Sequence, residues 1–118
     1  MANKRSRACQ FSSKEREAVY ERDQLRCIFC AQQYRMDEID PAGMDIFEVM
    51  HFIPRSQGGL GSRRNSAIGC KSHHMMLDNG SKGYRAEMQD IFREYLKSHY
   101  SDWNERDLIY DKWKEFAV

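Results

Sequence analysis

Two stretches decide the fold: VMHFIPRSQGG at residues 49–59 and NSAIGCKSHH at residues 65–74. The first belongs to an apolar run over residues 46–53 that is short and rich in β-branched and aromatic side chains, which predicts a strand. Glycines at the end of this stretch predict a loop, and residues 66–69 predict a short second strand. A brief helix over residues 71–78 should end at Asn79-Gly80, because glycine is favoured just beyond a helix C-terminus. The predicted order is strand, loop, strand, helix.

Two of the four cysteines begin matched pairs of the metal-ligand type. Cys27 and Cys30 form a C-x2-C pair, and Cys70 and His73 form a C-x2-H pair. Tetrahedral zinc takes four sulfur or nitrogen ligands, and two such pairs supply them. Two disulfides are the alternative in a secreted chain, but the matched spacing favours a closed structural Zn²⁺ site. Cys9 is left over and is predicted to be a plain thiol.

Length and composition indicate a single domain. The chain has 118 residues, of which 41% are hydrophobic and 31% are charged. Domains of about this length are the commonest, and no apolar run approaches the roughly 18 residues of a membrane-spanning helix. The basic, polar first ten residues are not followed by the apolar segment of a secretory signal. We therefore expect a cytoplasmic protein with no membrane partner.

Charges segregate into blocks along the chain. Residues 1–35 hold eight Lys/Arg and four Asp/Glu, residues 51–85 hold six and one, and residues 36–50 hold five acids and no base. The two basic blocks would form a phosphate-facing surface if they meet in the fold. Ordinary solvated faces are the alternative interpretation.

Helical signals flank the central stretches on both sides. Ser12 and Glu15 form a capping-box pattern, which predicts a helix over residues 13–23. Apolar residues at helical spacing predict an amphipathic helix over residues 84–98 and another over residues 104–116. The predicted organisation is a basic flexible arm (1–12), a core with the zinc site (13–80) and a C-terminal helical extension packed on that core (81–118).

A histidine at the end of a strand, an asparagine before the next strand and a histidine on the following helix together resemble the HNH endonucleases of phages and prophages. The resemblance rests on His51, Asn65 and His74 in their order and spacing, and it covers about residues 15–80. It implies an α+β fold of the ββα-metal (His-Me finger) type, in which a hairpin and a helix grip one divalent cation, braced here by a zinc knuckle. The implied activity is metal-dependent hydrolysis of phosphodiester bonds in DNA, by nicking or by double-strand cleavage.

The resemblance also implies roles for individual residues. His51 matches the general base that activates water, a task that suits an imidazole because its ordinary pKa is near neutral. Asn65 matches the asparagine that fixes the loop, and His74 matches the last motif histidine, a metal ligand in some members. Asp78, four residues on, should share a helix face with His74, so that the two hold a catalytic cation such as Mg²⁺, Mn²⁺ or Ni²⁺. The predicted contacts to DNA phosphates are Arg55, Arg63, Arg64 and Lys71.

Two positions depart from the family pattern: His73 stands where a cysteine is commoner, which zinc tolerates, and Met50 affects the catalytic cation. The residue before the catalytic histidine usually supplies a hard metal ligand, whereas here it is Met50, whose thioether is a poor ligand for Mg²⁺. Glu48 is a less favoured helper, because strand alternation places it opposite His51. The alternative function is therefore a catalytically weak or inactive zinc-braced DNA-binding module. A zinc-dependent protein-interaction module would leave the basic residues 51–85 unexplained.

Overall fold

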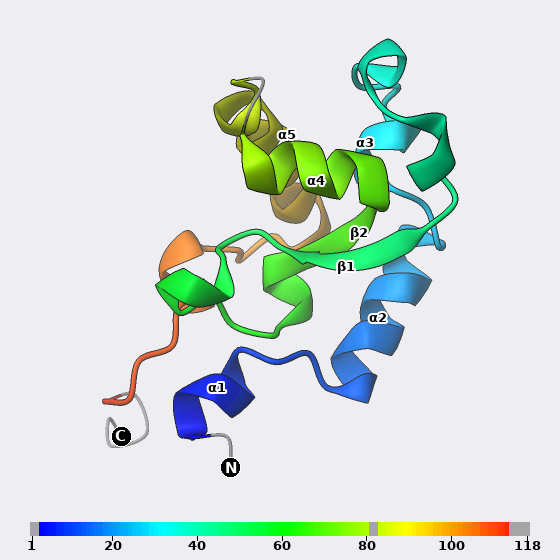
Figure 1. Cartoon of the computed structure of the whole chain (residues 1–118). Coiled ribbons are helices and arrows are strands. Elements are labelled where there is room, and N and C mark those ends of the chain that lie inside the picture. The colour runs from blue at the N-terminus through cyan, green and yellow to red at the C-terminus, as the bar shows by residue number, and fades with distance from the viewer. Residues whose placement is uncertain (1–2, 81–82, 114–118) are drawn as a thin grey trace.

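The computed structural model describes residues 3–80 and 83–113, which form a small α+β fold around one two-stranded sheet (Figure 1). Its α-helices and strands, in chain order, are α1 (Lys4–Ala8), α2 (Ser13–Asp23), α3 (Ile28–Ala31), β1 (Phe47–His51), β2 (Ser66–Cys70), α4 (Lys71–Asn79) and α5 (Arg85–His99). Short 3-10 helices lie between these elements at Met36–Glu38, Pro41–Gly43, Arg55–Gln57 and Arg63–Asn65, and a further one follows α5 at Glu105–Leu108.

β1 and β2 form an antiparallel hairpin, and α4 follows β2 without a break. His51 pairs with Ser66 at the loop end of the ladder. The predicted order of strand, loop, strand and helix is confirmed, with each boundary within two residues of its predicted place. The loop depends on its glycines: Gly58 has a φ of 82°, and a Cβ at Gly59 would lie 1.7 Å from the carbonyl oxygen of Ile53. Only glycine fits these positions, so the loop folds back onto the end of β1.

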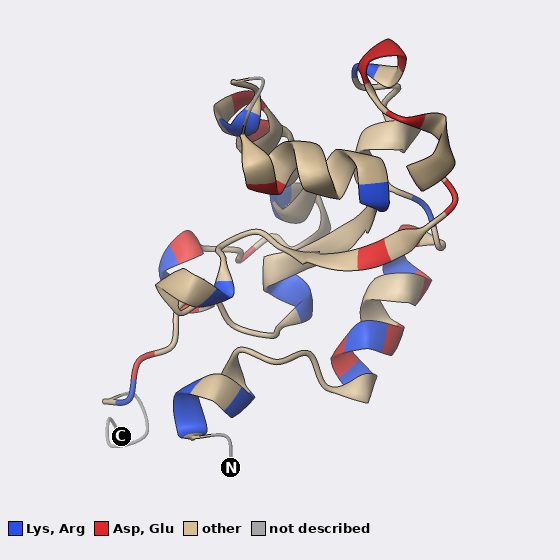
Figure 2. Cartoon of the chain, in the orientation of Figure 1, with Lys and Arg blue, Asp and Glu red and all other residues tan. Residues whose placement is uncertain are grey.

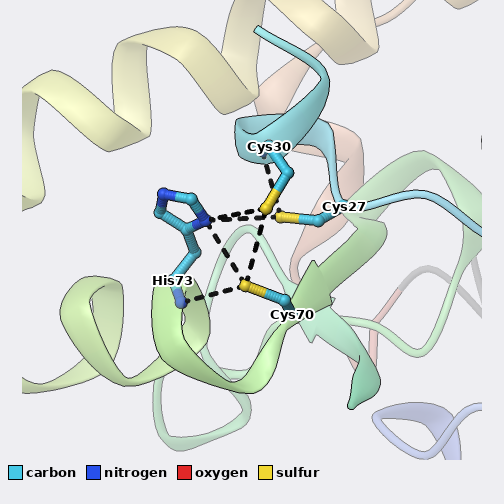
Figure 3. A group of neighbouring side chains, drawn as sticks. All are labelled: Cys27, Cys30, Cys70 and His73. Carbon is cyan, nitrogen blue, oxygen red and sulfur yellow. Dashed lines mark hydrogen bonds between the residues drawn. The ribbon is translucent and has the colours of Figure 1, made fainter. Parts of the chain in front are cut away.

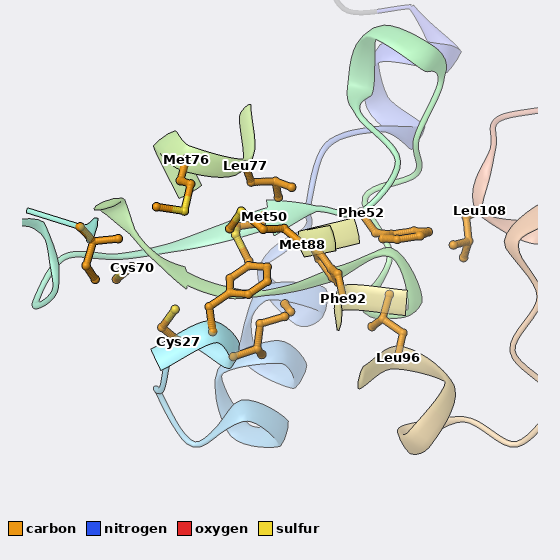
Figure 4. Close-up of a cluster of buried hydrophobic side chains, with 14 residues drawn as sticks. Cys27, Met50, Phe52, Cys70, Met76, Leu77, Met88, Phe92, Leu96 and Leu108 are labelled. Carbon is orange, nitrogen blue, oxygen red and sulfur yellow. The ribbon is translucent and has the colours of Figure 1, made fainter. Parts of the chain in front are cut away.

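The core forms where α3, α4 and α5 meet the hairpin (Figure 4). Met88, Phe92 and Leu96 recur at every fourth residue of α5, and all three are fully buried. Phe92 packs edge-on against Phe52, with ring centroids 5.2 Å apart, a preferred aromatic arrangement. The amphipathic helix predicted over residues 84–98 is thus confirmed as α5.

α2, also confirmed, closes the open edge of β2 with side chains instead of a third strand. Asp23 accepts a hydrogen bond from the backbone N–H of Ile68 at 2.8 Å, and Arg22 donates to the carbonyl oxygen of Ser66 at 2.7 Å. Arg22 and Asp23 also pair with each other at 2.7 Å, and the hydroxyl of Tyr95 donates to Asp23. Unpaired groups on a sheet edge invite pairing with another chain. In this edge Asp23 and Arg22 satisfy one such donor and one such acceptor, which holds α2 against the sheet.

The C-terminal segment differs from the helix predicted over residues 104–116. In its described part it forms only the 3-10 helix Glu105–Leu108, after which Ile109 makes an antiparallel bridge with Gly59. Backbone groups of the glycine loop thus find partners in an extended segment, whereas a short helix alone is marginal in water. Residues 114–116 of the predicted helix lie outside the described residues.

The segment predicted as a flexible basic arm contains α1 and packs on the loop between the strands. Cys9, just after α1, is buried, and Gly61 donates its N–H to the carbonyl oxygen of Ala8 at 2.9 Å. A Cβ at Gly61 would lie 2.0 Å from the carbonyl oxygen of Gln10, so the arm crosses directly over the loop.

Lys and Arg gather on α1 and on the loop that faces it, while the acidic residues of segment 36–45 lie at the other end of the molecule (Figure 2). Of the second basic block, Arg55 lies next to α1, where it lines a small cavity together with Arg5. No helix among residues 3–80 and 83–113 has the length and apolar composition needed to cross a bilayer.

Candidate functional site

Three cysteines and a histidine converge between α3 and the start of α4 (Figure 3). Nδ1 of His73 lies 3.6 Å from Sγ of Cys27 and 3.4 Å from Sγ of both Cys30 and Cys70, and the last two sulfurs are 3.8 Å apart. Tetrahedral zinc, with bonds of about 2.3 Å to sulfur and about 2.0 Å to nitrogen, separates its ligands by about 3.8 Å (S to S) and about 3.5 Å (S to N). The four atoms are positioned to hold one metal ion, with spacing compatible with zinc.

Helix capping explains how two short sequence pairs reach this geometry. Cys27 caps α3 and Cys70 caps α4, and each sulfur accepts a hydrogen bond at 3.4 Å from the backbone N–H three residues on. The second ligand of each pair, Cys30 or His73, therefore lies in the first helical turn. Nε2 of His73 donates to the carbonyl oxygen of Tyr34 at 2.7 Å, which leaves Nδ1 as a free lone pair facing the sulfurs. Burial raises the pKa of the Cys27 and Cys30 thiols, so a bound cation must displace their protons.

His51, at the end of β1, is held by the N-terminal segment. Its Nε2 lies 2.9 Å from the carbonyl oxygen of Cys9, and its ring lies 4.3 Å from the ring of Phe11, centroid to centroid. A carbonyl oxygen only accepts, so Nε2 carries the proton. The neutral imidazole therefore presents Nδ1 as a lone pair, and this atom has no hydrogen-bond partner among the described residues. The contacts of Cys9 and Phe11 fix both the tautomer and the plane of the ring.

Burial and nearby positive charge keep His51 neutral. Burial is the largest cause that lowers the pKa of His51; the Cys9 carbonyl opposes it, and Arg55, His74 and Arg16 lower the pKa further. An imidazole with a pKa below its ordinary value of about 6.5 is unprotonated near neutral pH. His51 is thus a base in a positive field, which is also a field that attracts anions.

His74, on α4, lies between two carboxylates. Its Nδ1 is 2.8 Å from Oε1 of Glu48, and its Nε2 is 3.1 Å from Oδ2 of Asp78. The predicted sharing of a helix face by His74 and Asp78 is confirmed. Glu48 reaches the other side of the ring from β1, a contact that strand alternation did not suggest. A histidine whose Nδ1–H is held by a carboxylate presents Nε2 as a metal-binding lone pair.

His51, His74 and Asp78 line one small cavity of about 170 Å³ between the end of β1 and α4. Arg55 of the loop and Arg85 of α5 line it too. The cavity thus joins an oriented base, a histidine–carboxylate pair and two permanent cations. That combination suits a phosphate ester, because the guanidinium groups match the charge and shape of a phosphate.

Comparison of the chain with protein-family models, with curated proteins and with solved structures finds no match.

Asn65 is fully buried, and its side-chain amide forms hydrogen bonds to the backbone of the loop. Its Oδ1 accepts from the N–H of Ile53 at 2.8 Å, and its Nδ2 donates to the carbonyl oxygens of Ile53 (3.1 Å) and Leu60 (2.9 Å). The predicted loop-fixing role fits these contacts. The amide does not touch His51, so it positions the base only through the backbone that follows β1.

Of the four basic residues predicted to contact DNA, only Arg55 lies at the cavity. Arg63 binds Glu15 through two nitrogens, at 2.7 and 3.1 Å, and Arg64 binds Asp102 at 2.9 Å. Those guanidinium groups hold α2 and the segment after α5 to the fold. Lys71 lines a different groove, of about 440 Å³, on another face of α4. Charge alone did not distinguish these structural ion pairs from a residue that faces the cavity.

Met50 lies in the core, away from the cavity. Its side chain is fully buried, and a Cβ at Gly69 would lie 2.2 Å from its sulfur. The position that usually carries a hard metal ligand therefore points into the apolar interior of this chain. An apolar side chain fits this fully buried position.

Sequence reasoning missed Phe11, Arg85 and Gln89. Gln89 lines the cavity and donates from Nε2 to the carbonyl oxygen of Phe52 at 3.1 Å, next to His51. Periodicity predicts α5 but does not tell which of its polar side chains face the cavity. Phe11 had a usable signal: an apolar residue immediately before an N-cap serine often packs against the first turns of the helix.

Proposed function

We propose that this protein is a metal-dependent HNH-type endonuclease that hydrolyses phosphodiester bonds in DNA. One observation carries the proposal: an imidazole with a fixed tautomer and a free Nδ1, His51, opens on the same cavity as the His74–Asp78 pair. A base poised near neutral pH, a cation-binding pair and a phosphate-binding arginine are the components that hydrolysis of a phosphodiester needs.

His51 is the general base in this proposal. Its Nδ1 takes a proton from a water molecule, the water oxygen forms a bond to phosphorus, and the P–O bond to the leaving oxygen of the DNA strand breaks, so that this oxygen departs and takes up a proton from solvent. The positive charge that develops on the ring is stabilised by the Cys9 carbonyl, which already accepts from Nε2. A correctly placed base of this kind contributes about 10² to 10⁴ in rate.

His74 and Asp78 hold the catalytic cation. Two neighbouring ligands of a six-coordinate cation with bonds of about 2.1 Å lie about 3.0 Å apart, and Nε2 of His74 and Oδ2 of Asp78 are 3.1 Å apart. A divalent cation bound there supplies positive charge to the phosphate and to the leaving oxygen. Glu48 holds Nδ1 of His74 and so fixes the ring that binds it. With one nitrogen and one oxygen from the chain, we expect a preference for Mn²⁺ or Ni²⁺ over Mg²⁺.

The cysteine–histidine cluster holds a structural Zn²⁺. All four protein ligands are present, so the site is closed and has no open position for a substrate. Zinc there joins α3 to the junction of β2 and α4. The hairpin, the helix and this brace support a ββα-metal arrangement, with His51 on the first strand, Asn65 before the second and His74 on the helix.

Incubation of supercoiled plasmid with the wild-type protein tests the function. We expect nicked or linear product with Mn²⁺ or Ni²⁺, less with Mg²⁺, and none with His51→Ala. His99→Ala is the matched control, because His99 is an exposed histidine of α5 that does not line the cavity. Plasmid that is bound but never cut, with any of the three cations, would favour the zinc-braced DNA-binding module instead.

A further inference from the structure

A second small cavity adjoins the first at α1. It has a volume of about 140 Å³ and is lined by Asn3, Arg5, Ser6, Cys9 and Arg55. Arg55 lines this cavity and the His51 cavity alike, so the two are neighbours that share one guanidinium group. Sequence patterns alone did not distinguish Arg5 from the other basic residues of the arm.

The position of Arg5 is fixed by the loop that carries Arg55. Its Nη2 lies 3.4 Å from the carbonyl oxygen of Ser56, and a Cβ at Gly58 would be 3.5 Å from the same nitrogen. The guanidinium group therefore lies against Gly58, at a distance where a Cβ would be in ordinary van der Waals contact with it. One edge of the group is engaged with the loop, which leaves its other N–H donors for a ligand.

Charge in the second cavity is positive and uncompensated. None of the residues that line it is acidic, and neither Arg5 nor Arg55 forms an ion pair with any described residue. Arg63 and Arg64, by contrast, each have a carboxylate partner. Two guanidinium groups around one small polar cavity repel each other, and an anion between them removes that repulsion. Forked N–H donors suit a phosphate oxygen pair, and the Ser6 hydroxyl adds a further donor.

We infer that Arg5, Ser6 and Arg55 form a subsite for a second backbone phosphate of the DNA strand, next to the phosphate that lies at His51. The inference rests on the proposed function, since it names how the same site holds its substrate. It assigns α1 a direct part in substrate binding, beyond the contacts of Cys9 and Phe11 with the base.

The first test compares Arg5→Gln with Arg7→Gln. Both residues are exposed arginines of α1, but only Arg5 lines the cavity. Binding of a fluorescent DNA duplex is measured by anisotropy over a NaCl series without added divalent cation. We expect Arg5→Gln to weaken binding about tenfold and to lower the salt slope by about one, and Arg7→Gln to stay within twofold of wild type. Equal losses of DNA affinity in the two variants would overturn the subsite, because they would show only a general electrostatic attraction between α1 and DNA.

The second test changes the DNA. A methylphosphonate, which is neutral but similar in shape, replaces the phosphate on either side of the cleaved bond. We expect one replacement to weaken wild-type binding as much as Arg5→Gln does, and to weaken Arg5→Gln no further. Independent, additive losses would place Arg5 elsewhere on the DNA, and no loss in the wild type would overturn the subsite.

These readouts separate the inference from the proposed function. If the wild type binds the duplex and cuts none, the nuclease proposal fails, while the contrast between Arg5→Gln and Arg7→Gln in binding still decides the subsite. Because both arginines are exposed, unchanged melting temperatures are expected and show that a loss of binding is local.

Discussion

The side-chain amide of Asn65 binds both backbone groups of Ile53: Oδ1 accepts the N–H at 2.8 Å, and Nδ2 donates to the carbonyl oxygen at 3.1 Å. Ile53 lies two residues after His51, at the point where the chain leaves the hairpin. A fully buried amide thus replaces the ladder partner that the loop residue no longer has in the sheet.

Asn65→Ala should therefore destabilise the fold. Three hydrogen bonds are lost, and buried backbone groups are left unpaired, at about 1 kcal/mol or more for each bond. We expect a loss of about 3 kcal/mol in the free energy of unfolding, measured by urea denaturation. Asn104→Ala is the control, since Asn104 is exposed and, among the described residues, its amide oxygen accepts only the N–H of Arg106; the loss in this variant should stay near about 1 kcal/mol. Equal losses in the two variants would contradict the role given to Asn65.

Metal binding should depend on Cys27 and be independent of Cys9. Both thiols are buried, but only Cys27 belongs to the metal-binding cluster. Because the binding energy of a structural zinc is folding energy, Cys27→Ser should lose one equivalent of zinc and more than about 10 °C of melting temperature. Cys9→Ser should keep the zinc. Elemental analysis and thermal melting measure both, and zinc-free wild-type protein with the same melting temperature would contradict the structural role.

Activity should fall at acid pH as His51 becomes protonated. The pKa of His51 lies below its ordinary value of about 6.5, so kcat/KM should hold at neutral pH and decline only when the pH falls below that ordinary value. Removal of the Arg55 charge raises that pKa, because a nearby cation disfavours the protonated ring. Arg55→Gln should therefore lower the rate. It should also move the decline of kcat/KM on the acid side of the pH profile to higher pH. Arg7→Gln, which leaves the cavity unchanged, should keep the wild-type profile; a shifted profile there would contradict the assignment.

Phe11 should act as a positioning residue for the base. Its ring covers His51, so Phe11→Ala lets the imidazole turn and exposes it to water. We expect about a tenfold loss in kcat, of the size that a misplaced catalytic group causes, and an acid limb at higher pH, since less burial raises the pKa of His51. Phe11→Leu should restore part of the burial and part of the rate. A wild-type pH profile in Phe11→Ala would show that the ring contact serves only stability.

Met50→Asp should not add a ligand for the catalytic cation. The carboxylate would enter the core at a fully buried position against Gly69, where a charge costs several kcal/mol. We expect poor folding and no lower requirement for Mg²⁺, whereas Met50→Leu should cost less than about 1.5 kcal/mol. Circular dichroism measures the folding of the variants, and a Mg²⁺ titration of DNA cleavage measures their Mg²⁺ requirement. A folded, more active Met50→Asp protein would mean that this side chain can reach the cavity.

Local patterns predicted the central elements well, for physical reasons that differ from site to site. The two ligand pairs are short-range features of helix starts, so Cys27, Cys30, Cys70 and His73 could be assigned from spacing alone. The order of β1, β2 and α4 followed from apolar periodicity and glycine. Long-range contacts were not predictable in this way: the Cys9 carbonyl on His51, Glu48 on His74 and the pairing of Ile109 with Gly59 depend on how distant segments pack.

His73 and His74 are consecutive on α4, yet one faces the metal-binding cluster and the other the cavity. Consecutive side chains of an α-helix point about 100° apart around its axis. The contacts that hold His73 in the cluster therefore fix how α4 is rotated about its axis. That rotation sets the direction of the side chains of His74 and, one turn later, of Asp78. If the cluster holds the proposed zinc, partial loss of that ion should turn His74 and Asp78 away from the cavity by a small rotation of α4, before the hairpin unfolds.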